Sequence, residues 1–220
     1  MKNKTRVSFK YKVFLICLAA LLILPFRSVQ ARADDKGWDN LSFEAMHEFK
    51  VFDVESGLPF LGYLTVAQTP DGFLYAGGYG GLVRYDGKRF ERVKGIDSVV
   101  SLFVTEDGSL WIGTNGGKLI CMAGNDELTV YGKEEGLDVV GIRAICEDAA
   151  GTLVFGTDKG VYTLDGTGSI RIMDDKRLQT CYVNQLSVDA DGTIYGSDYD
   201  GNVFVIRDLS VAAYLEGDTI

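Results

Sequence analysis

Residues 107–117 have the sequence DGSLWIGTNGG, and variants of this pattern occur at three other places in the chain. In each copy an Asp-Gly or Ala-Gly pair precedes a short apolar run, and a second glycine follows the first by nine residues. Four matches at fixed offsets are hard to attribute to chance, so we treat the chain as a repeat protein. The residues that define the repeat are Asp71, Gly72, Gly81, Asp107, Gly108, Trp111, Gly113, Gly117, Gly151, Gly156, Gly160, Asp191, Gly192 and Gly201.

The spacing of the copies predicts the fold. Starting at Gly72, the equivalent glycines follow at intervals of 36, 43 and 41 residues, which suits the four-stranded blade of a β-propeller. Each copy contains short runs rich in β-branched and aromatic residues, such as residues 100–105 and 110–114, separated by glycine. The sequence therefore predicts an all-β chain, a β-propeller of four-stranded blades with about four blades present and the ring incomplete.

Turn signals and small residues fit this fold. Glycine adopts positive φ freely and aspartate does so better than most residues, so Asp-Gly pairs favour tight turns. Trp111 in the second strand of its unit is expected to pack on the neighbouring blade, while Gly77 and Gly113 let the backbones approach closely. The pattern departs in two places, because Ala150 replaces the turn aspartate and Ser197 replaces the second-strand glycine. The Asp-Gly pairs begin at Asp71, Asp86, Asp107, Asp165, Asp191 and Asp200.

The repeat also predicts where the blades lie. Residues 49–54 are expected to form an outer strand without a blade of its own, and residues 209–220 to start a further blade. In a closed propeller such an N-terminal strand completes the last blade. Residues 49–220 are therefore expected to form a partial propeller after a lead-in at 34–48. The blades, each with its innermost strand first, are expected at 61–93, 99–131, 139–173 and 183–206.

The first 33 residues have the three parts of a secretory signal peptide. A basic stretch ends at Lys12, an apolar run covers 13–24, and Ala31-Arg32-Ala33 precedes Asp34. Twelve apolar residues fall well short of the roughly twenty that a spanning helix needs, which argues against an uncleaved anchor. We therefore expect cleavage after Ala33 and export to the periplasm or the extracellular space.

The charge of the chain excludes some classes of partner. The formal charge of −9 includes seven basic residues that precede Asp34, and without them 15 basic residues stand against 31 acidic ones. A surface with this excess of negative charge repels phosphate backbones and anionic lipid headgroups. Nucleic acid is therefore not expected as a partner, nor is a membrane surface.

The sequence offers little for catalysis. Its only histidine, His47, precedes the first blade, so a Ser-His-Asp triad and a His-rich metal site are excluded. Residues 189–192 and 198–202 resemble calcium loops but lack the closing Glu, and we expect them to be turns. No catalytic residue, cofactor or metal ligand is predicted, and the chain itself is not expected to be an enzyme. Three cysteines remain after the leader, and their odd number predicts free thiols in strands: Cys121, Cys146 and Cys181.

Several stretches resemble the two-component regulator propeller repeat. Residues 57–59 (GLP), 68–74 (QTPDGFL) and 80–87 (GGLVRYDG) follow its pattern, and residues 106–117 with 134–137 (EEGL) follow it more closely. The resemblance implies a periplasmic or extracellular sensor propeller, of the kind that precedes a membrane helix and a cytoplasmic histidine kinase or diguanylate cyclase module. Since that family closes rings of about seven blades, it also implies a truncated sensor without its output module.

We therefore expect an extracytoplasmic, ligand-binding sensor propeller of a bacterial signal-transduction receptor. Its ligand site is expected on the innermost strands and the loops that join blades. Two alternatives stay open, namely a propeller enzyme such as a lyase or glycosidase, and a passive protein-interaction scaffold. The expected partners are an unknown extracellular small molecule, glycan or protein, the remainder of the sensor protein, and a second copy if the chain forms a homodimer.

N-terminal sequencing of the exported protein tests the leader. We expect the mature chain to begin at Asp34, because small residues at positions 31 and 33 suit signal peptidase. The variant Ala33→Gln should accumulate as the precursor, whereas Ala19→Gln in the apolar run keeps the cleavage site. A mature chain that begins elsewhere would contradict the assignment.

Overall fold

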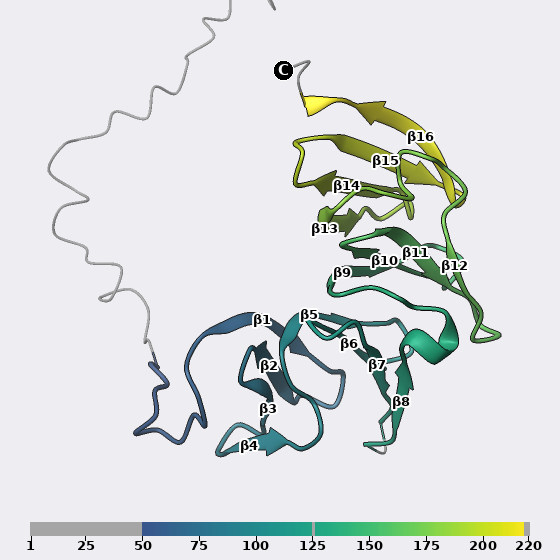
Figure 1. Ribbon diagram of the computed structural model, residues 1–220. Helices are drawn as coiled ribbons and strands as arrows, with labels where there is room; N and C mark the ends of the chain where they lie inside the picture. Colours follow the sequence, from purple (N-terminus) through teal and green to yellow (C-terminus); the bar gives the residue numbers. More distant parts are fainter. Residues whose placement is uncertain (1–49, 125, 218–220) are drawn as a thin grey trace, which may run out of the picture. The chain divides into compact units, whose positions relative to one another are not determined.

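The computed structural model describes residues 50–124 and 126–217 (Figure 1). Contacts divide the chain into two compact units, Met1–Val51 and Phe52–Ile220, and all described strands lie in the second. Within the described ranges no helix is long and apolar enough to cross a membrane. The elements are β1 (Tyr63–Gln68), β2 (Leu74–Gly78), β3 (Gly81–Tyr85), β4 (Phe90–Val93), β5 (Val99–Val104), β6 (Leu110–Thr114), β7 (Leu119–Met122), β8 (Leu128–Tyr131), a 3-10 helix (Lys133–Glu135), β9 (Ile142–Glu147), β10 (Leu153–Thr157), β11 (Gly160–Leu164), β12 (Ile170–Ile172), β13 (Val183–Val188), β14 (Ile194–Asp198), β15 (Val203–Arg207) and β16 (Ser210–Leu215).

The strands form four antiparallel sheets of four consecutive strands each. We number them blade 1 (β1–β4), blade 2 (β5–β8), blade 3 (β9–β12) and blade 4 (β13–β16). The first strands of successive blades are neighbours, with β5 between β1 and β9, and β9 beside β13. The prediction of a propeller with four-stranded blades and the innermost strand first is confirmed.

Apolar side chains fill each boundary between blades. Tyr75 of blade 1 packs with Val99 and Leu110 of blade 2 in one cluster of buried residues. Trp111 of blade 2 packs against the next cluster, which includes Leu119 of blade 2 and Phe155 of blade 3. Burial of each large apolar side chain contributes about 1.5–3 kcal/mol, so these boundaries stabilise the fold. The blade 3–4 boundary contains Val154, Val161, Val183, Leu186, Ile194 and Phe204.

Three equivalent glycines set how closely the blades approach. A Cβ added at any of them would lie less than 3.0 Å from the first residue of the next blade's innermost strand. Any side chain would therefore force the two blades apart. The pairs of glycine and facing residue are Gly77 with Val99, Gly113 with Ile142, and Gly156 with Val183.

The two glycines at nine-residue spacing have different roles. The first of each pair has φ between +78° and +91° in the turn after the innermost strand, as Gly108 does. The second lies against the segment that leads to the next blade. Gly81, Gly117 and Gly160 have positive φ, and a Cβ at each would lie within 3.0 Å of a carbonyl oxygen in that segment. Both positions therefore require glycine, which explains the repeat.

Two different carboxylates hold the turn after the innermost strand. Asp107 Oδ1 accepts hydrogen bonds from residues two places before and two after it, at 2.7 and 2.9 Å. Asp148 and Asp189 stand two places earlier in their turns and accept amide hydrogen bonds at 2.8–3.0 Å. Ala150 can therefore replace the aspartate without loss of the turn. Asp191 lies in the turn and donates its amide to Asp189 Oδ1 at 3.0 Å.

Residues 210–215 complete blade 4 as β16, which corrects the prediction that residues 209–220 start a further blade. Arg207 pairs with Ser210, so the hairpin loop consists of Asp208 and Leu209 alone. Both have positive φ, at 49° and 53°, in the manner of a type I′ turn. Because the loop lacks glycine, it carries no hairpin signal that the sequence could reveal.

The outer strand predicted at residues 49–54 is not formed in its described part, which corrects that prediction. Residues 50–53 have no regular structure and a turn covers 54–57. A strand needs a hydrogen-bonded neighbour, and no described strand pairs with this segment. Phe52 instead packs edge-on against Phe90 of β4, with the ring centroids 5.0 Å apart.

We expect Gly113→Ala to destabilise the protein by about 3 kcal/mol, because its methyl group would overlap the Ile142 carbonyl oxygen. The matched control is Gly116→Ala, whose nearest atom would lie 3.9 Å away and whose φ is not positive. Urea unfolding followed by circular dichroism measures both variants. Equal unfolding midpoints would contradict the spacing role of Gly113.

Candidate functional site

The starts of the innermost strands and the turns after the second strands lie at the same end of the blades. The amide of Asn115, in the β6–β7 turn, donates to the Ser98 carbonyl just before β5 at 2.7 Å. The amide of Tyr199, in the β14–β15 turn, donates to the Tyr182 carbonyl just before β13 at 2.9 Å. This end is where a site on innermost strands and blade-joining loops was expected.

Arg143 and two tyrosines form a stacked cluster at this end of blades 3 and 4. Arg143 is the second residue of β9. Its Cζ lies 4.7 Å from the ring centroid of Tyr182 and 5.7 Å from that of Tyr199, and the two ring centroids are 4.6 Å apart. Arg143 Nη2 also donates a hydrogen bond to Tyr182 Oη. The guanidinium is therefore held by cation–π attraction and one hydrogen bond across the blade boundary.

The charge of Arg143 has no carboxylate within ion-pair distance among the described residues. By contrast, Arg84, Arg92 and Arg177 each form an ion pair with an aspartate. The Nε of Arg143 is buried and has no hydrogen-bond acceptor in the described part of the chain. An unsatisfied buried donor costs about 1–3 kcal/mol, so the fold gains nothing from it. The cluster thus holds a positive charge and a donor that the described residues leave uncompensated.

The cluster is partly exposed to solvent. Tyr199 is 58% exposed, whereas Arg143 is half-buried. Asp158 fixes the start of β9, because its Oδ1 accepts the amides of Val140 and Gly141 at 2.7 and 2.9 Å. A guanidinium fork suits a planar acceptor such as a carboxylate, and the tyrosine faces suit flat or apolar groups. The cluster thus places a guanidinium beside two aromatic faces.

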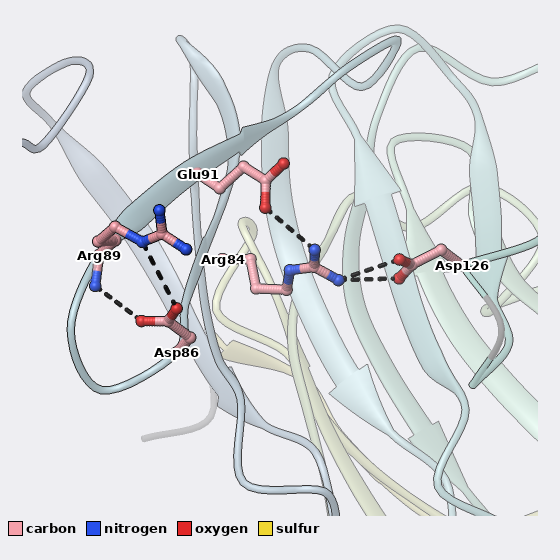
Figure 2. A network of polar contacts seen from close by, with 5 residues as sticks. All are labelled: Arg84, Asp86, Arg89, Glu91 and Asp126. Atoms are coloured by element: carbon pink, nitrogen blue, oxygen red, sulfur yellow. Dashed lines mark hydrogen bonds and ion pairs between the residues drawn. The ribbon is translucent and has the colours of Figure 1, made fainter.

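A second polar centre joins blades 1 and 2 (Figure 2). Arg84 of β3 donates to Glu91 of β4 at 3.0 Å and to both carboxylate oxygens of Asp126, in the β7–β8 turn, at 3.0 and 3.1 Å. Its hydrogen bond to Glu91 is the main reason that the pKa of Arg84 is raised above its usual value. Arg89 lies beside Asp86, at 4.0 Å between Nε and Oδ2. Because these arginines are paired, we interpret the centre as a clamp between blades.

The described residues bring no metal-binding cluster together. The one histidine, His47, lies outside them. Between residues 50 and 217, position 125 excepted, no cluster of three or more His, Cys, Asp or Glu could hold a metal ion. Asp198 Oδ1 accepts the amides of Asp200 and Asn202 at 3.0 and 2.9 Å. This stretch is therefore a turn, as the sequence predicted.

Cys121, Cys146 and Cys181 are free thiols, as predicted. Cys121 and Cys146 lie in strands, whereas Cys181 lies just before β13. Burial is the main cause of the raised pKa values, about 12 for Cys146 and about 11 for Cys181. Both thiols stay protonated near neutral pH, which makes them poor nucleophiles.

The residues that define the repeat lie in turns and blade boundaries, and none of them belongs to the Arg143 cluster. Sequence reasoning missed Arg143, Tyr182 and Tyr199, because it aligned the glycines and not the strand registers. Strand pairing places Arg143 at the second position of the innermost strand of blade 3. Among the four residues at this position, one in each blade, Arg143 is the only charged one. The residues at that position in the other blades are Leu64, Val100 and Asn184.

Comparisons with known proteins agree with the repeat. The family model described as two component regulator propeller matches residues 95–116, from the approach to β5 to the end of β6 and its turn. The structure named as the extracellular domain of the hybrid two component system BT3049 from B. thetaiotaomicron has a TM-score of 0.65 at 20% identity, over 75% of this chain and 24% of that chain. The extracellular domain of the one component system BT4673 from the same organism has a TM-score of 0.54 at 26% identity, over 67% and 22%. The predicted family is thus supported by both sequence and fold.

Enzymes share the fold as well. A variant of virginiamycin B lyase from Staphylococcus aureus, named as catalytically inactive through a His-to-Ala substitution, has a TM-score of 0.60 at 13% identity. The match covers 70% of this chain and 55% of the lyase. This chain therefore spans about half of the lyase and about a quarter of the B. thetaiotaomicron domains. No curated protein matches the chain in sequence.

We expect Arg84→Gln to lower the free energy of unfolding by about 1 kcal/mol at low ionic strength. Solvent screens Glu91 and Asp126, which are 71% and 63% exposed, so the loss should shrink in about 1 M NaCl. Arg92→Gln, which breaks the exposed pair with Asp97, is the control and should change stability by less than about 0.5 kcal/mol. Urea unfolding measures the free energy of unfolding of both variants. An equal loss of stability in the two would contradict the interpretation of the Arg84 centre as a clamp between blades.

Proposed function

Because the chain carries the two component regulator propeller repeat, we propose that it is an extracytoplasmic sensor propeller that binds a small ligand at the Arg143 cluster. The observation that supports this proposal most is the uncompensated guanidinium of Arg143, stacked on Tyr182 at the boundary of two blades. The leader and the B. thetaiotaomicron extracellular domains support export. The signal would pass to an output module of the histidine kinase or diguanylate cyclase type.

Recognition rests on the chemistry of three side chains. An acceptor group of the ligand would bind the Arg143 guanidinium and compensate its charge. Tyr182 and Tyr199 would contact a flat or apolar part of the ligand, with Tyr199 closest to solvent. The strongly acidic surface disfavours polyanions, so a small molecule with a single acidic group fits best.

The position of the cluster suggests how binding is transmitted. Arg143 belongs to blade 3, whereas Tyr182 and Tyr199 belong to blade 4. A ligand that contacts all three would favour one relative position of the two blades over others. It can shift that equilibrium only as far as its affinities for the two positions differ.

A lyase activity is the second candidate, and the fold shared with virginiamycin B lyase favours it. Such an activity would need a general base at the blade ends. The described blades contain no histidine, which leaves carboxylates such as Asp158 for that role, and its Oδ1 already accepts two amide hydrogen bonds. The sensor therefore remains the better supported function.

Thermal unfolding of the exported protein with a panel of monocarboxylates and neutral sugars tests the sensor proposal. We expect at least one monocarboxylate to stabilise the protein, by about 2.7 kcal/mol when its concentration is 100 times its Kd. Arg143→Gln should abolish this stabilisation, because the charged donor is lost. The control Arg171→Gln removes an exposed arginine from β12 of the same blade. This variant should be stabilised by the ligand as strongly as the original protein.

Two results would contradict the proposed site. One is a ligand that stabilises Arg143→Gln as strongly as the original protein. The other is stabilisation by neutral sugars alone, since these carry no charge for the guanidinium to compensate. Turnover of any panel member, measured by mass spectrometry, would favour the lyase instead.

A further inference from the structure

Every described blade has a β-bulge at the second residue of its innermost strand. In the pairing of β5 with β6, Val99 and Ser101 lie opposite adjacent residues of β6, so Val100 has no partner. The pairing of β9 with β10 skips Arg143 in the same way, and the bulges of blades 1 and 4 lie at the equivalent residues. A bulge takes a side chain out of the regular alternation of its strand. The four blades thus share one backbone feature that carries a different side chain in each.

The residues on either side of a bulge show where the bulged side chain is directed. Val99 faces Gly77 of blade 1, whereas Ser101 faces blade 3, where its Oγ donates to the Ile142 carbonyl at 2.7 Å. In a regular strand these two residues would lie on the same face of the sheet. Because the positions facing both neighbouring blades are occupied, the side chain of Val100 is directed away from both boundaries, toward the open edge of the innermost strand.

The bulges of blades 2 and 3 lie side by side. Strands β5 and β9 are neighbours, and the hydrogen bond from Ser101 to Ile142 joins them. Val100 directly precedes Ser101, and Arg143 directly follows Ile142, so one bonded pair links the two bulges. Each of these two blades packs between two others, so both bulges have their neighbouring blades within the described residues.

Two valines near the bulge of Arg143 are not packed in the core. Val100 is half-buried, and Val140, in the segment that leads to β9, is 60% exposed. Among the described residues, neither belongs to a cluster that fills a blade boundary, although the residue before Val140 does. The backbone of Val140 is held in place, because its amide donates to Asp158 at 2.7 Å. Blade 2 and the segment between blades 2 and 3 thus add two accessible apolar groups to a guanidinium that stacks on Tyr182 of blade 4.

We propose that the ligand of this site is a monocarboxylate with an apolar chain, which binds Arg143 through its carboxylate and Val100 and Val140 through its chain. This inference rests on the proposed function, because it names the ligand class for the same site. The guanidinium compensates a single negative charge, and each methylene group that the valines remove from water adds to the affinity. Val100 is therefore a specificity-determining residue, since the bulge fixes its backbone and its side chain selects the length of the ligand.

Thermal unfolding of the exported protein over a range of concentrations of acetate, butanoate and hexanoate tests the inference, because the stabilisation yields a Kd for each. We expect the affinity to rise by up to about fourfold for each added methylene group, so that hexanoate binds about tenfold or more tightly than acetate. Val100→Ser should lower the affinity for hexanoate about threefold or more, because the valine methyl groups that contact the chain are lost. Its affinity for acetate should be unchanged, since acetate has no chain to reach residue 100.

The matched control is Val130→Ser, the same change at a valine that is 45% exposed on the outer strand β8 of the same blade. This variant should bind acetate and hexanoate as the original protein does. Without ligand, Val100→Ser should unfold within about 2 °C of the original protein, because its side chain fills no blade boundary. A lower affinity of Val100→Ser then reports the lost contact and not a loss of folding.

The outcomes separate this inference from the proposed function. If acetate and hexanoate bind equally and Arg143→Gln abolishes the binding of both, the carboxylate site stands and the apolar contact is overturned. The apolar contact is also overturned if Val100→Ser and Val130→Ser change the affinity for hexanoate equally. If no carboxylate of the series stabilises the protein at any concentration, the inference fails together with the proposed site.

Discussion

The fold depends on the close approach between the second strand of one blade and the innermost strand of the next. Gly77, Gly113 and Gly156 leave no room for a side chain opposite the first residue of that strand. The short distance brings the apolar faces of neighbouring blades into contact, so that Leu82 and Val161 are completely buried. Burial of these faces stabilises the fold. The glycines permit the short separation between blades at which this burial occurs.

The turns and linkers follow from this constraint. The innermost strand must reverse within a few residues, and the chain must then reach the next blade without crossing the boundary. Gly108 and its equivalents provide the positive φ that the reversal needs, while Gly117 and its equivalents lie against the linker backbone. A carboxylate satisfies the turn amides from either of two positions, which is why Asp107 and Asp148 serve equivalent turns.

The Arg143 cluster is of a different kind, because it is not repeated. The repeat uses apolar or neutral residues at the second position of the innermost strand, and only blade 3 places a charge there. The fourth blade also departs from the repeat, because Ser197 stands at the position of the second-strand glycine. The repeat accounts for its own residues by packing, whereas Arg143 has no such structural explanation.

The sequence by itself determined the all-β class, the four-stranded blade, the strand order and the structural role of the repeat residues. It could do so because the glycine and Asp-Gly positions respond to local backbone geometry, which is encoded within a few residues. Only the tertiary structure decided that residues 210–215 close blade 4, since the Asp208-Leu209 turn uses positive φ without glycine. It alone also brought Arg143 to Tyr182 and Tyr199, because that contact joins side chains from different blades, 39 residues apart for the first pair. Such a contact depends on how the blades stack, and no local pattern records it.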